Sequence, residues 1–380
     1  MSVKYIRNAQ VVTENGIIWD GAITIENGLI TAVGKEKDNP APVGAEIIDA
    51  CGYYIGPGFV DIHCHAGNNF LTTEEAEKAC AFLLEHGETS VLATTDYVWS
   101  LERHVNAAKT VREVMSKIKN LKGIYFEGPG INIKYGANAR DNPWKNEITE
   151  AEYTAMVDAA GDLAKVWTIA PERPGIKNFM AYARKVNPMV RIAVGHSEAT
   201  PKQIMDMGIY KPTIQTHSMN ATGRGVPDRG GVRGYGPDEY CFRDPDVYCE
   251  LISDSQTIHV DACLQQLLLH VKGVNRVILI TDGTLSEGDN PEELRHITDL
   301  NFDQYGALCG SKMTMEQACK NVMSSTNCGI AQAFIMASTN PAKAVGLDDV
   351  GSIEVGKKAD FVIVDDKFNL KKVIIQGEIL

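Results

Sequence analysis

Eight short apolar runs recur through the middle of this 380-residue chain, and each ends in polar, reactive side chains. Helix-like stretches with capping signals separate many of them. In residues 72–87, for example, Thr72 or Thr73 is the expected N-cap and Gly87 the expected end. Strands alternating with helices predict a parallel sheet covered by helices. The eight runs span residues 58–65, 89–96, 122–129, 165–172, 191–198, 212–219, 247–254 and 276–283.

Eight such units within about 230 residues predict an α/β fold, specifically a (β/α)8 TIM barrel. An open, doubly wound sheet is the alternative that the alternation leaves. The polar strand ends favour the barrel, because the active sites of such barrels lie at the carboxyl ends of the strands. The strand-end residues are His63, His65, Asp96, Glu127, Glu172, His196, His217, Asp254 and Asp282.

The two ends of the chain have a different character from its middle. In residues 1–55, Gly and Asn interrupt alternating apolar positions, which is typical of β-hairpins, and residues 351–380 follow the same pattern. We therefore expect a small β-sandwich domain formed by residues 1–55 and 351–380. Residues 56–350 would form the barrel.

Composition restricts the classes of partner. The net charge of −12 argues against nucleic acid or an anionic membrane as the main partner. A small anionic substrate is compatible with this charge, because a few local Arg, His and N–H groups suffice to bind it. No signal peptide and no run of roughly 18–20 apolar residues is found. The nine cysteines are scattered and never form a CxxC pair, which predicts a cytoplasmic protein with reduced thiols.

The segment GFVDIHCHAG contains two histidines that are two residues apart, at positions 63 and 65. On a strand such residues face the same side, so Cys64 is expected to point the other way, into the core. An HxH pair alone also occurs by chance. Further metal-competent residues at other strand ends weaken that alternative, and together they predict a divalent metal site. The candidate ligands are His63, His65, Glu127, His196, His217 and Asp282.

Imidazole and carboxylate ligands suit Zn²⁺, Fe²⁺, Mn²⁺ or Co²⁺, and the sequence does not choose among them.

Seven segments resemble, in order, those of the amidohydrolase superfamily, and more closely the N-acetylglucosamine-6-phosphate deacetylases. Each segment alone is weak, but their joint order and spacing are specific, and they cover essentially the whole chain. The segments are GFVDIHCHAG, GIYFEGPGIN, GHSEAT, THSMNAT, LITDGT, GALCGSKMTMEQA and NPAKAVGLDDVGSIEVGKKADFVIVD.

The resemblance implies a role for each candidate ligand. Glu127, His196 and His217 would hold the metal found throughout the family. Glu127 would also bridge to a second ion held by His63 and His65, so that one or two ions are bound, zinc being the first choice. Asp282 would lie nearby and act as general base and then general acid.

The implied reaction removes the N-acetyl group from an amino sugar 6-phosphate. N-acetylglucosamine 6-phosphate is the first candidate, giving glucosamine 6-phosphate and acetate. The resemblance also implies a homodimer in which a loop of one subunit reaches the phosphate site of the other. The implied substrate-binding residues are Ala137, Asn138, Asn220, Ala221, Arg229, His259, Leu308, Cys309 and Gly310. Alternatively, His259 is a helix-start residue without function and Cys309 an inert core residue.

Two departures from the family pattern lie around the substrate. The segment IKYGANARDN places Asn138, after Ala137, where the family has a histidine that faces the substrate. Asn can donate a hydrogen bond but carries no positive charge. The family's phosphate-binding arginine has three counterparts in the Gly-rich segment 222–242, namely Arg224, Arg229 and Arg233, of which Arg229 aligns best. The alternative is a surface loop with solvated arginines.

These departures leave other functions open. The substrate is alternatively N-acetylgalactosamine 6-phosphate or a related N-acyl sugar. Another amidohydrolase would act on a cyclic amide or an N-acyl amino acid, but such enzymes commonly carry a carboxylated lysine on strand four. A non-catalytic barrel is the third alternative, although such proteins usually lose their metal ligands.

Overall fold

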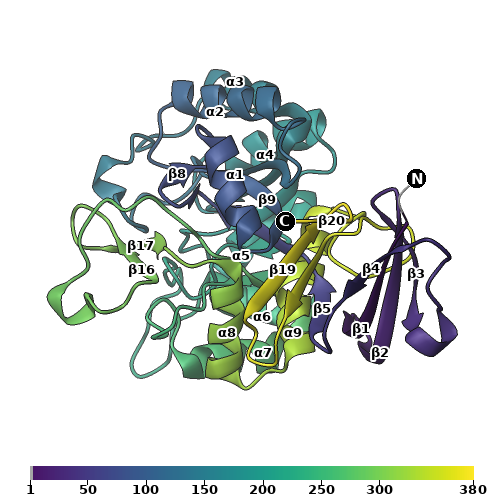
Figure 1. The fold of residues 1–380 in the computed structure, drawn as a ribbon. Coiled ribbons are helices and arrows are strands. Elements are labelled where there is room, and N and C mark those ends of the chain that lie inside the picture. Colours follow the sequence, from purple (N-terminus) through teal and green to yellow (C-terminus); the bar gives the residue numbers. More distant parts are fainter. Residues whose placement is uncertain (1–2) are drawn as a thin grey trace.

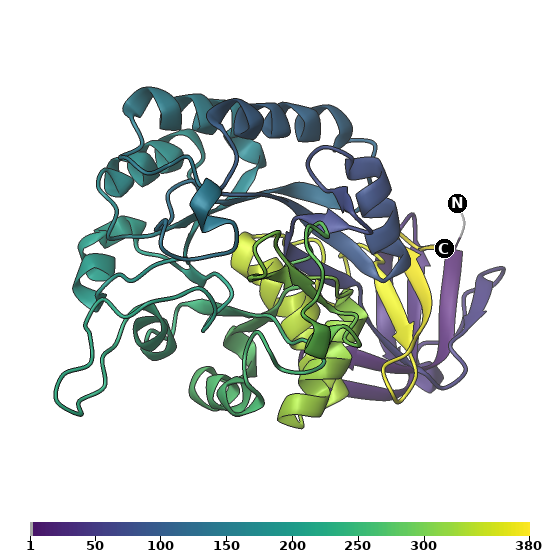
Figure 2. The same ribbon diagram turned by 90° about the vertical axis from the view of Figure 1, so that its left-hand side faces the viewer.

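A parallel eight-stranded sheet forms the centre of the computed structural model, which describes residues 3–380. All eight predicted runs are strands of this sheet, in sequence order, and helices cover its outer face (Figures 1 and 2). The strands are β6 (Phe59–Cys64), β9 (Glu88–Thr95), β10 (Leu121–Glu127), β11 (Ala164–Ile169), β12 (Arg191–Val194), β13 (Ile214–Gln215), β14 (Tyr248–Leu251) and β15 (Val277–Leu279).

Hydrogen bonds between the segment that follows β15 and the end of β6 close this sheet into a barrel. The N–H of Asp282 donates to the carbonyl oxygen of His63 at 3.0 Å, and the N–H of Ala66 donates to that of Gly283 at 2.7 Å. The hydroxyl of Thr281 donates to Oδ2 of Asp61 at 2.5 Å. An open sheet has no such contacts between its edges, so the doubly wound alternative is wrong and the predicted barrel is confirmed.

Two of the outer helices begin at residues whose side chains cap the first turn. Thr149 and Thr200 cap α3 (Glu150–Ala160) and α5 (Pro201–Asp206) through reciprocal capping boxes. The predicted cap of α1 (Ala76–Glu85) is wrong, because Glu75 precedes this helix. The hydroxyl of Thr72 instead lies 2.9 Å from the carbonyl oxygens of Cys64 and His65. The other outer helices are α2 (Leu101–Val114), α4 (Ile176–Val186), α6 (Pro237–Arg243), α7 (Ala262–Lys272) and α8 (Met315–Thr326).

Strands from both ends of the chain form a second sheet, called here the terminal sheet, in which yellow C-terminal strands lie beside purple N-terminal strands (Figure 1). Nζ of Lys4 donates to the carbonyl oxygen of Gly377 at 2.8 Å, so the sheet curls around a core of its own. The fold class is therefore confirmed, whereas the exact domain limits stay a prediction. Its strands are β1 (Val3–Thr13), β2 (Gly16–Glu26), β3 (Leu29–Lys35), β4 (Glu46–Asp49), β5 (Tyr54–Pro57), β18 (Phe361–Val364), β19 (Leu370–Ile375) and β20 (Glu378–Ile379).

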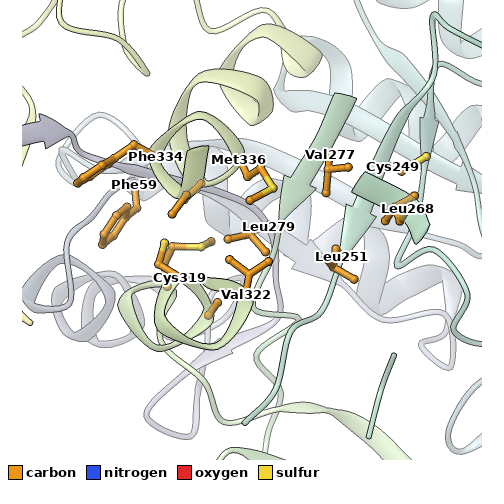
Figure 3. Packing of buried hydrophobic residues seen from close by; sticks show 14 of the residues in the cluster. Phe59, Cys249, Leu251, Leu268, Val277, Leu279, Cys319, Val322, Phe334 and Met336 are labelled. Atoms are coloured by element: carbon orange, nitrogen blue, oxygen red, sulfur yellow. The ribbon is translucent and has the colours of Figure 1, made fainter. Parts of the chain in front are cut away.

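A continuous helical segment joins the terminal sheet to the barrel. It consists of α9 (Ile330–Phe334), a π-turn (Ile335–Thr339) and α10 (Asn340–Val345). The ring of Phe334 lies 5.9 Å from that of Phe59, at the start of the first barrel strand (Figure 3). It also lies 5.1 Å from the ring of Phe368. A Cβ on Gly56 would lie 2.3 Å from the Phe334 ring, so only glycine fits beneath it. No helix within residues 3–380 has the length and apolar character needed to cross a bilayer.

We expect Phe334→Ala to lower the free energy of unfolding by about 3–5 kcal/mol, because it leaves a cavity between the barrel and the terminal sheet. Urea denaturation measures this change. Ile209→Ala is the control, because Ile209 is 81% exposed and its loss should change the stability by less than about 0.5 kcal/mol. Equal stabilities of the two variants would contradict the packing role of Phe334.

Candidate metal centre and active site

A cavity of about 230 Å³ opens at the carboxyl ends of the barrel strands. Strand-end histidines and carboxylates form its polar floor. Backbone and small side chains from the following loops and from β17 (Leu308–Ser311) form its rim. The lining residues are His65, Asp96, Tyr97, Glu127, Gly136, Ala137, His196, His217, Asn220, Ala221, Asp282, Thr284, Ala307, Leu308, Cys309 and Gly310.

Glu127, the last residue of β10, lies at the centre of this floor. Its Oε1 is 2.8 Å from Nε2 of His196 and 3.0 Å from Nε2 of His217. Its Oε2 is 3.3 Å from Nε2 of His65. Nε2 of His63 lies 3.6 Å from Oε1. One carboxylate therefore lies between two groups of histidines, which is the position of a bridging ligand.

The ring orientations of His196 and His217 fit a cation. Their Nδ1 atoms lie 3.3 and 3.2 Å from the carbonyl oxygens of Tyr135 and Asn220, respectively. A carbonyl only accepts, so each Nδ1 carries a proton and a neutral ring presents its Nε2 lone pair. The two Nε2 atoms are 2.9 Å apart and both face Glu127. Three electron-rich atoms this close repel one another unless protons or a cation lies among them, and this donor set suits a divalent metal.

His63 and His65 form a second group of donors with Glu127 and Asp282. Nε2 of His63 and Nε2 of His65 lie 3.6 and 3.4 Å from Oδ1 of Asp282. Nε2 of His63 is buried and has no hydrogen-bond partner among the described residues. Ligand atoms of His63, His65 and Glu127 all lie within 4.8 Å of one another. This group fits a second cation, with Glu127 shared between the two positions.

The neighbouring histidines determine the charge of the two central carboxylates. Burial alone would raise the pKa of Asp282, but the charges of His63 and His65 and the hydrogen bond from His65 lower it to about 2. Burial would also raise the pKa of Glu127, but the charges of His196 and His63 hold it well below its usual value. Both side chains are therefore carboxylates at neutral pH and are available as ligands or proton acceptors.

The sequence of the chain matches a known protein family. The model of the amidohydrolase family matches residues 54–380. The chain belongs to the amidohydrolase family. Members of this family are metal-dependent, and this amidohydrolase gathers two His-carboxylate clusters where its strands end.

Individual relatives are similar over nearly their whole length. The chain is 29% identical to an N-acetylglucosamine-6-phosphate deacetylase of Bacillus subtilis (strain 168), covering 98% of this chain and 96% of the relative. It is 26% identical to an N-acetylgalactosamine-6-phosphate deacetylase of Escherichia coli O157:H7, covering 98% of each chain.

A solved structure of an N-acetyl-D-glucosamine-6-phosphate deacetylase variant from Mycobacterium smegmatis, in complex with N-acetyl-D-glucosamine-6-phosphate, superposes with a TM-score of 0.84 at 25% identity. This match covers 100% of this chain and 99% of that one.

Most residues predicted to bind substrate lie at this amidohydrolase's cavity. Six of them line it, namely Ala137, Asn220, Ala221, Leu308, Cys309 and Gly310. Burial raises the pKa of the Cys309 thiol, so this group stays protonated at neutral pH and is a poor nucleophile. Cys64 packs against Leu83 and Val91 on the outer side of the strand, as predicted.

Asn138 lies beside the cavity, but its side chain is held by the opposite rim. Its Nδ2 donates to Glu287 at 2.7 Å, and its backbone N–H donates to Asp303 at 2.8 Å. Its Oδ1 is buried without a hydrogen-bond partner among the described residues. This position therefore presents an amide between two carboxylates.

The structure does not bring Arg229 to the cavity of its own chain. Arg229 lies at an exposed turn of segment 223–235, which projects from the barrel as the teal-green loop at the lower left of Figure 2. Arg224 pairs with Asp228 at 3.1 Å, and Arg233 pairs with Glu239 at 3.2 Å. Within the described chain, no Lys or Arg lines the cavity.

Two polar residues at the site, Tyr97 and Glu250, were not predicted from the sequence. The hydroxyl of Tyr97 donates to the carbonyl oxygen of Ala137 at 2.6 Å and so fixes the rim. Glu250, in β14, is fully buried, and its Oε2 lies 3.1 Å from Nδ1 of His63. A glutamate inside the apolar run VYCELISD was the signal for the second.

His259 lies next to the cavity rim and is oriented by Asp254, which follows β14. Nδ1 of His259 lies 3.0 Å from Oδ2 of Asp254, and its Nε2 lies 3.0 Å from the carbonyl oxygen of Gly310. Backbone N–H groups of residues 256, 258 and 259 also donate to Asp254. Burial would raise the pKa of Asp254, but the bonds from His259 and the backbone lower it to about 2.

We expect Asp254→Asn to lower the free energy of unfolding by about 1–3 kcal/mol at pH 7, because hydrogen bonds to a charged acceptor are lost. The pKa of Asp254 is depressed in the folded state, so its contribution is complete above the unfolded value of about 3.9 and is lost as the pH falls towards 2. The stability difference between wild type and variant should therefore be constant above pH 5 and shrink below pH 4.

Urea denaturation across this pH range measures the difference. Asp206→Asn is the control, because Asp206 forms only an exposed pair with Lys202. A stability loss from Asp254→Asn that persists unchanged at pH 2.5 would contradict the assigned role.

Proposed function

We propose that this amidohydrolase removes the N-acetyl group from an amino sugar 6-phosphate, with N-acetylglucosamine 6-phosphate as first candidate, releasing acetate. The observation that carries the proposal is the pair of His-carboxylate clusters that share Glu127 on the floor of the cavity. The full-length likeness to deacetylases acting on this class of substrate supports it.

Asp282 is proposed as the proton-transfer residue. Its carboxylate lines the cavity and is ionised at neutral pH, so it could accept a proton from the attacking water and return it to the departing amine. Glu127, His196 and His217 would hold one divalent ion, and His63 and His65 a second, with Glu127 between them. A bound ion would lower the pKa of water towards about 7 and polarise the acetyl carbonyl.

We propose zinc as the metal and two ions per chain. Four of the six candidate ligands are imidazoles and two are carboxylates, those of Glu127 and Asp282. This set suits Zn²⁺ and also Fe²⁺, Mn²⁺ or Co²⁺. N-acetylgalactosamine 6-phosphate is the second candidate substrate. The similar deacetylase of Escherichia coli O157:H7 and the unusual Asn138 both favour testing it.

We expect acetate release from one or more N-acetylated hexosamine 6-phosphates, followed by an enzyme-coupled acetate assay. Asp282→Asn should lower kcat at least about 10³-fold, because it removes the proton acceptor, while most of the metal content is retained. Elemental analysis of both proteins measures the metal.

Asp360→Asn is the matched control, since Asp360 is also buried but lies just before β18 of the terminal sheet, where it accepts from the N–H of Gln376. It should keep normal kcat. No acetate from any sugar phosphate would refute the proposed function, and full activity of Asp282→Asn would refute the mechanism.

We further propose a homodimer in which Arg229 reaches the cavity of the partner subunit. A phosphate needs a cationic or N–H partner, and no Lys or Arg of the described chain lines its own cavity. Arg229 is exposed and, unlike Arg224 and Arg233, has no ion pair among residues 3–380. The nine free thiols support a cytoplasmic location.

We expect Arg229→Ala to raise KM at least about 10-fold with little change in kcat, because it removes uniform binding of the phosphate. Arg224→Ala is the control. Mixing Arg229→Ala chains with Asp282→Asn chains should restore sites of normal KM, since a hybrid dimer pairs an intact catalytic cavity with an intact Arg229. A monomer by analytical ultracentrifugation, or unchanged KM in Arg229→Ala, would contradict the dimer model.

A further inference from the structure

Glu250 is the one acidic side chain of β14, and it points into the barrel. Its neighbours Cys249 and Leu251 pack outward against the helices, with Leu268 and Val277 (Figure 3). Glu250 is fully buried, and its Oε1 has no hydrogen-bond partner among the described residues. A buried carboxylate costs free energy unless positive charge or donors compensate it, so its contacts show what it does.

Oε2 of Glu250 contacts a candidate ligand of each proposed metal position. It lies 3.1 Å from Nδ1 of His63, a candidate ligand of the second ion. It also accepts the backbone N–H of His217, a candidate ligand of the first ion, at 3.2 Å. The φ of His217 is 26°, which is unfavourable for a non-glycine residue, so this hydrogen bond helps to hold a strained backbone.

The bond to Glu250 determines the tautomer of His63. A carboxylate only accepts, so Nδ1 of His63 carries the proton and Nε2 presents its lone pair. The ring also stacks on Tyr125, with centroids 4.5 Å apart, which fixes its plane. Nε2 of His63 therefore carries a free lone pair and has no hydrogen-bond partner among the described residues. It lies 3.6 Å from Oε1 of Glu127 and 3.6 Å from Oδ1 of Asp282.

The charge of the site also requires a partner for Glu250. Four carboxyl groups, those of Asp96, Glu127, Glu250 and Asp282, lie at the barrel mouth or directly beneath it, and among residues 3–380 none of them forms an ion pair with Lys or Arg. Buried carboxyl groups without a cationic side chain beside them favour the binding of divalent cations.

We propose that Glu250 is a positioning residue that commits this site to two metal ions, by holding His63 as the Nδ1–H tautomer aimed at the second position. The inference rests on the metal-dependent function proposed above and deepens it. A carboxylate behind a metal-binding histidine orients the ring and raises its basicity, and loss of such a partner typically weakens metal binding about 10–100-fold.

Metal binding without substrate tests this role. Metal-free protein, prepared with a chelator, is titrated with zinc and with cobalt by competition calorimetry, and the bound metal is counted by elemental analysis. Wild type should bind two ions per chain. Glu250→Gln keeps the shape of the side chain but removes its charge, and it should bind the first ion with unchanged affinity and the second about 10–100-fold more weakly.

Glu316→Gln is the matched control, because Glu316 lies 2.7 Å from Nδ1 of His86, away from the cavity. It should leave both affinities unchanged. In a His63→Gln background, which has already lost the second position, adding Glu250→Gln should weaken metal binding no further. The melting temperature of each metal-free variant shows whether the fold is kept.

The outcomes separate this inference from the proposed function. A single ion in saturated wild type, or equal affinities in Glu250→Gln and wild type, would overturn it. So would equal weakening of both ions together with a lower melting temperature, which would make Glu250 a packing residue. The experiment measures metal affinity, so it tests the role of Glu250 even if no sugar phosphate releases acetate. Conversely, a negative result for Glu250 would not contradict acetate release by the wild type.

Discussion

Closure of the barrel is the constraint on which the site depends. The N–H of Asp282, beyond the last strand, donates to the carbonyl oxygen of His63 on the first. This bond brings residues 219 positions apart in the sequence to adjacent places at the barrel mouth. Without it the proposed proton acceptor would not lie beside the HxH histidines. The hydroxyl of Thr281 on Asp61 adds a second link across the same seam.

The chemistry at this mouth follows from the balance of buried charge. Glu127, Glu250 and Asp282 are buried next to four histidines rather than next to Lys or Arg. Such a set is unfavourable as it stands, since imidazole lone pairs and carboxylate oxygens approach within about 3 Å of one another. Protons or divalent cations among these atoms remove the repulsion. The ligand atoms, and the barrel that brings them together, are therefore suited to divalent cations.

The recognition of substrate is built differently from the metal centre. The metal-facing side chains come from strands and strand ends, whose positions the barrel fixes. Two of the proposed substrate-facing groups come from loops: Asn138 bonds to Glu287 across the rim, and Arg229 lies on a projecting turn. This chain therefore departs from the deacetylase pattern where loops carry the contacts, and keeps it where strands do.

The sequence by itself determined the eight strands, the terminal sheet and the six candidate ligands. Each depends on a local pattern: an apolar run, a hairpin signal, or a histidine or carboxylate that follows a strand. It did not reveal the cap of α1, because Thr72 is used at a strand end, nor the part played by Glu250, whose partner His63 is 187 positions away. The sequence also did not reveal that Arg229 lies away from the cavity of its own chain. Only the tertiary structure decided these points, because the partner of a buried polar group is chosen by which strands become neighbours when the barrel closes.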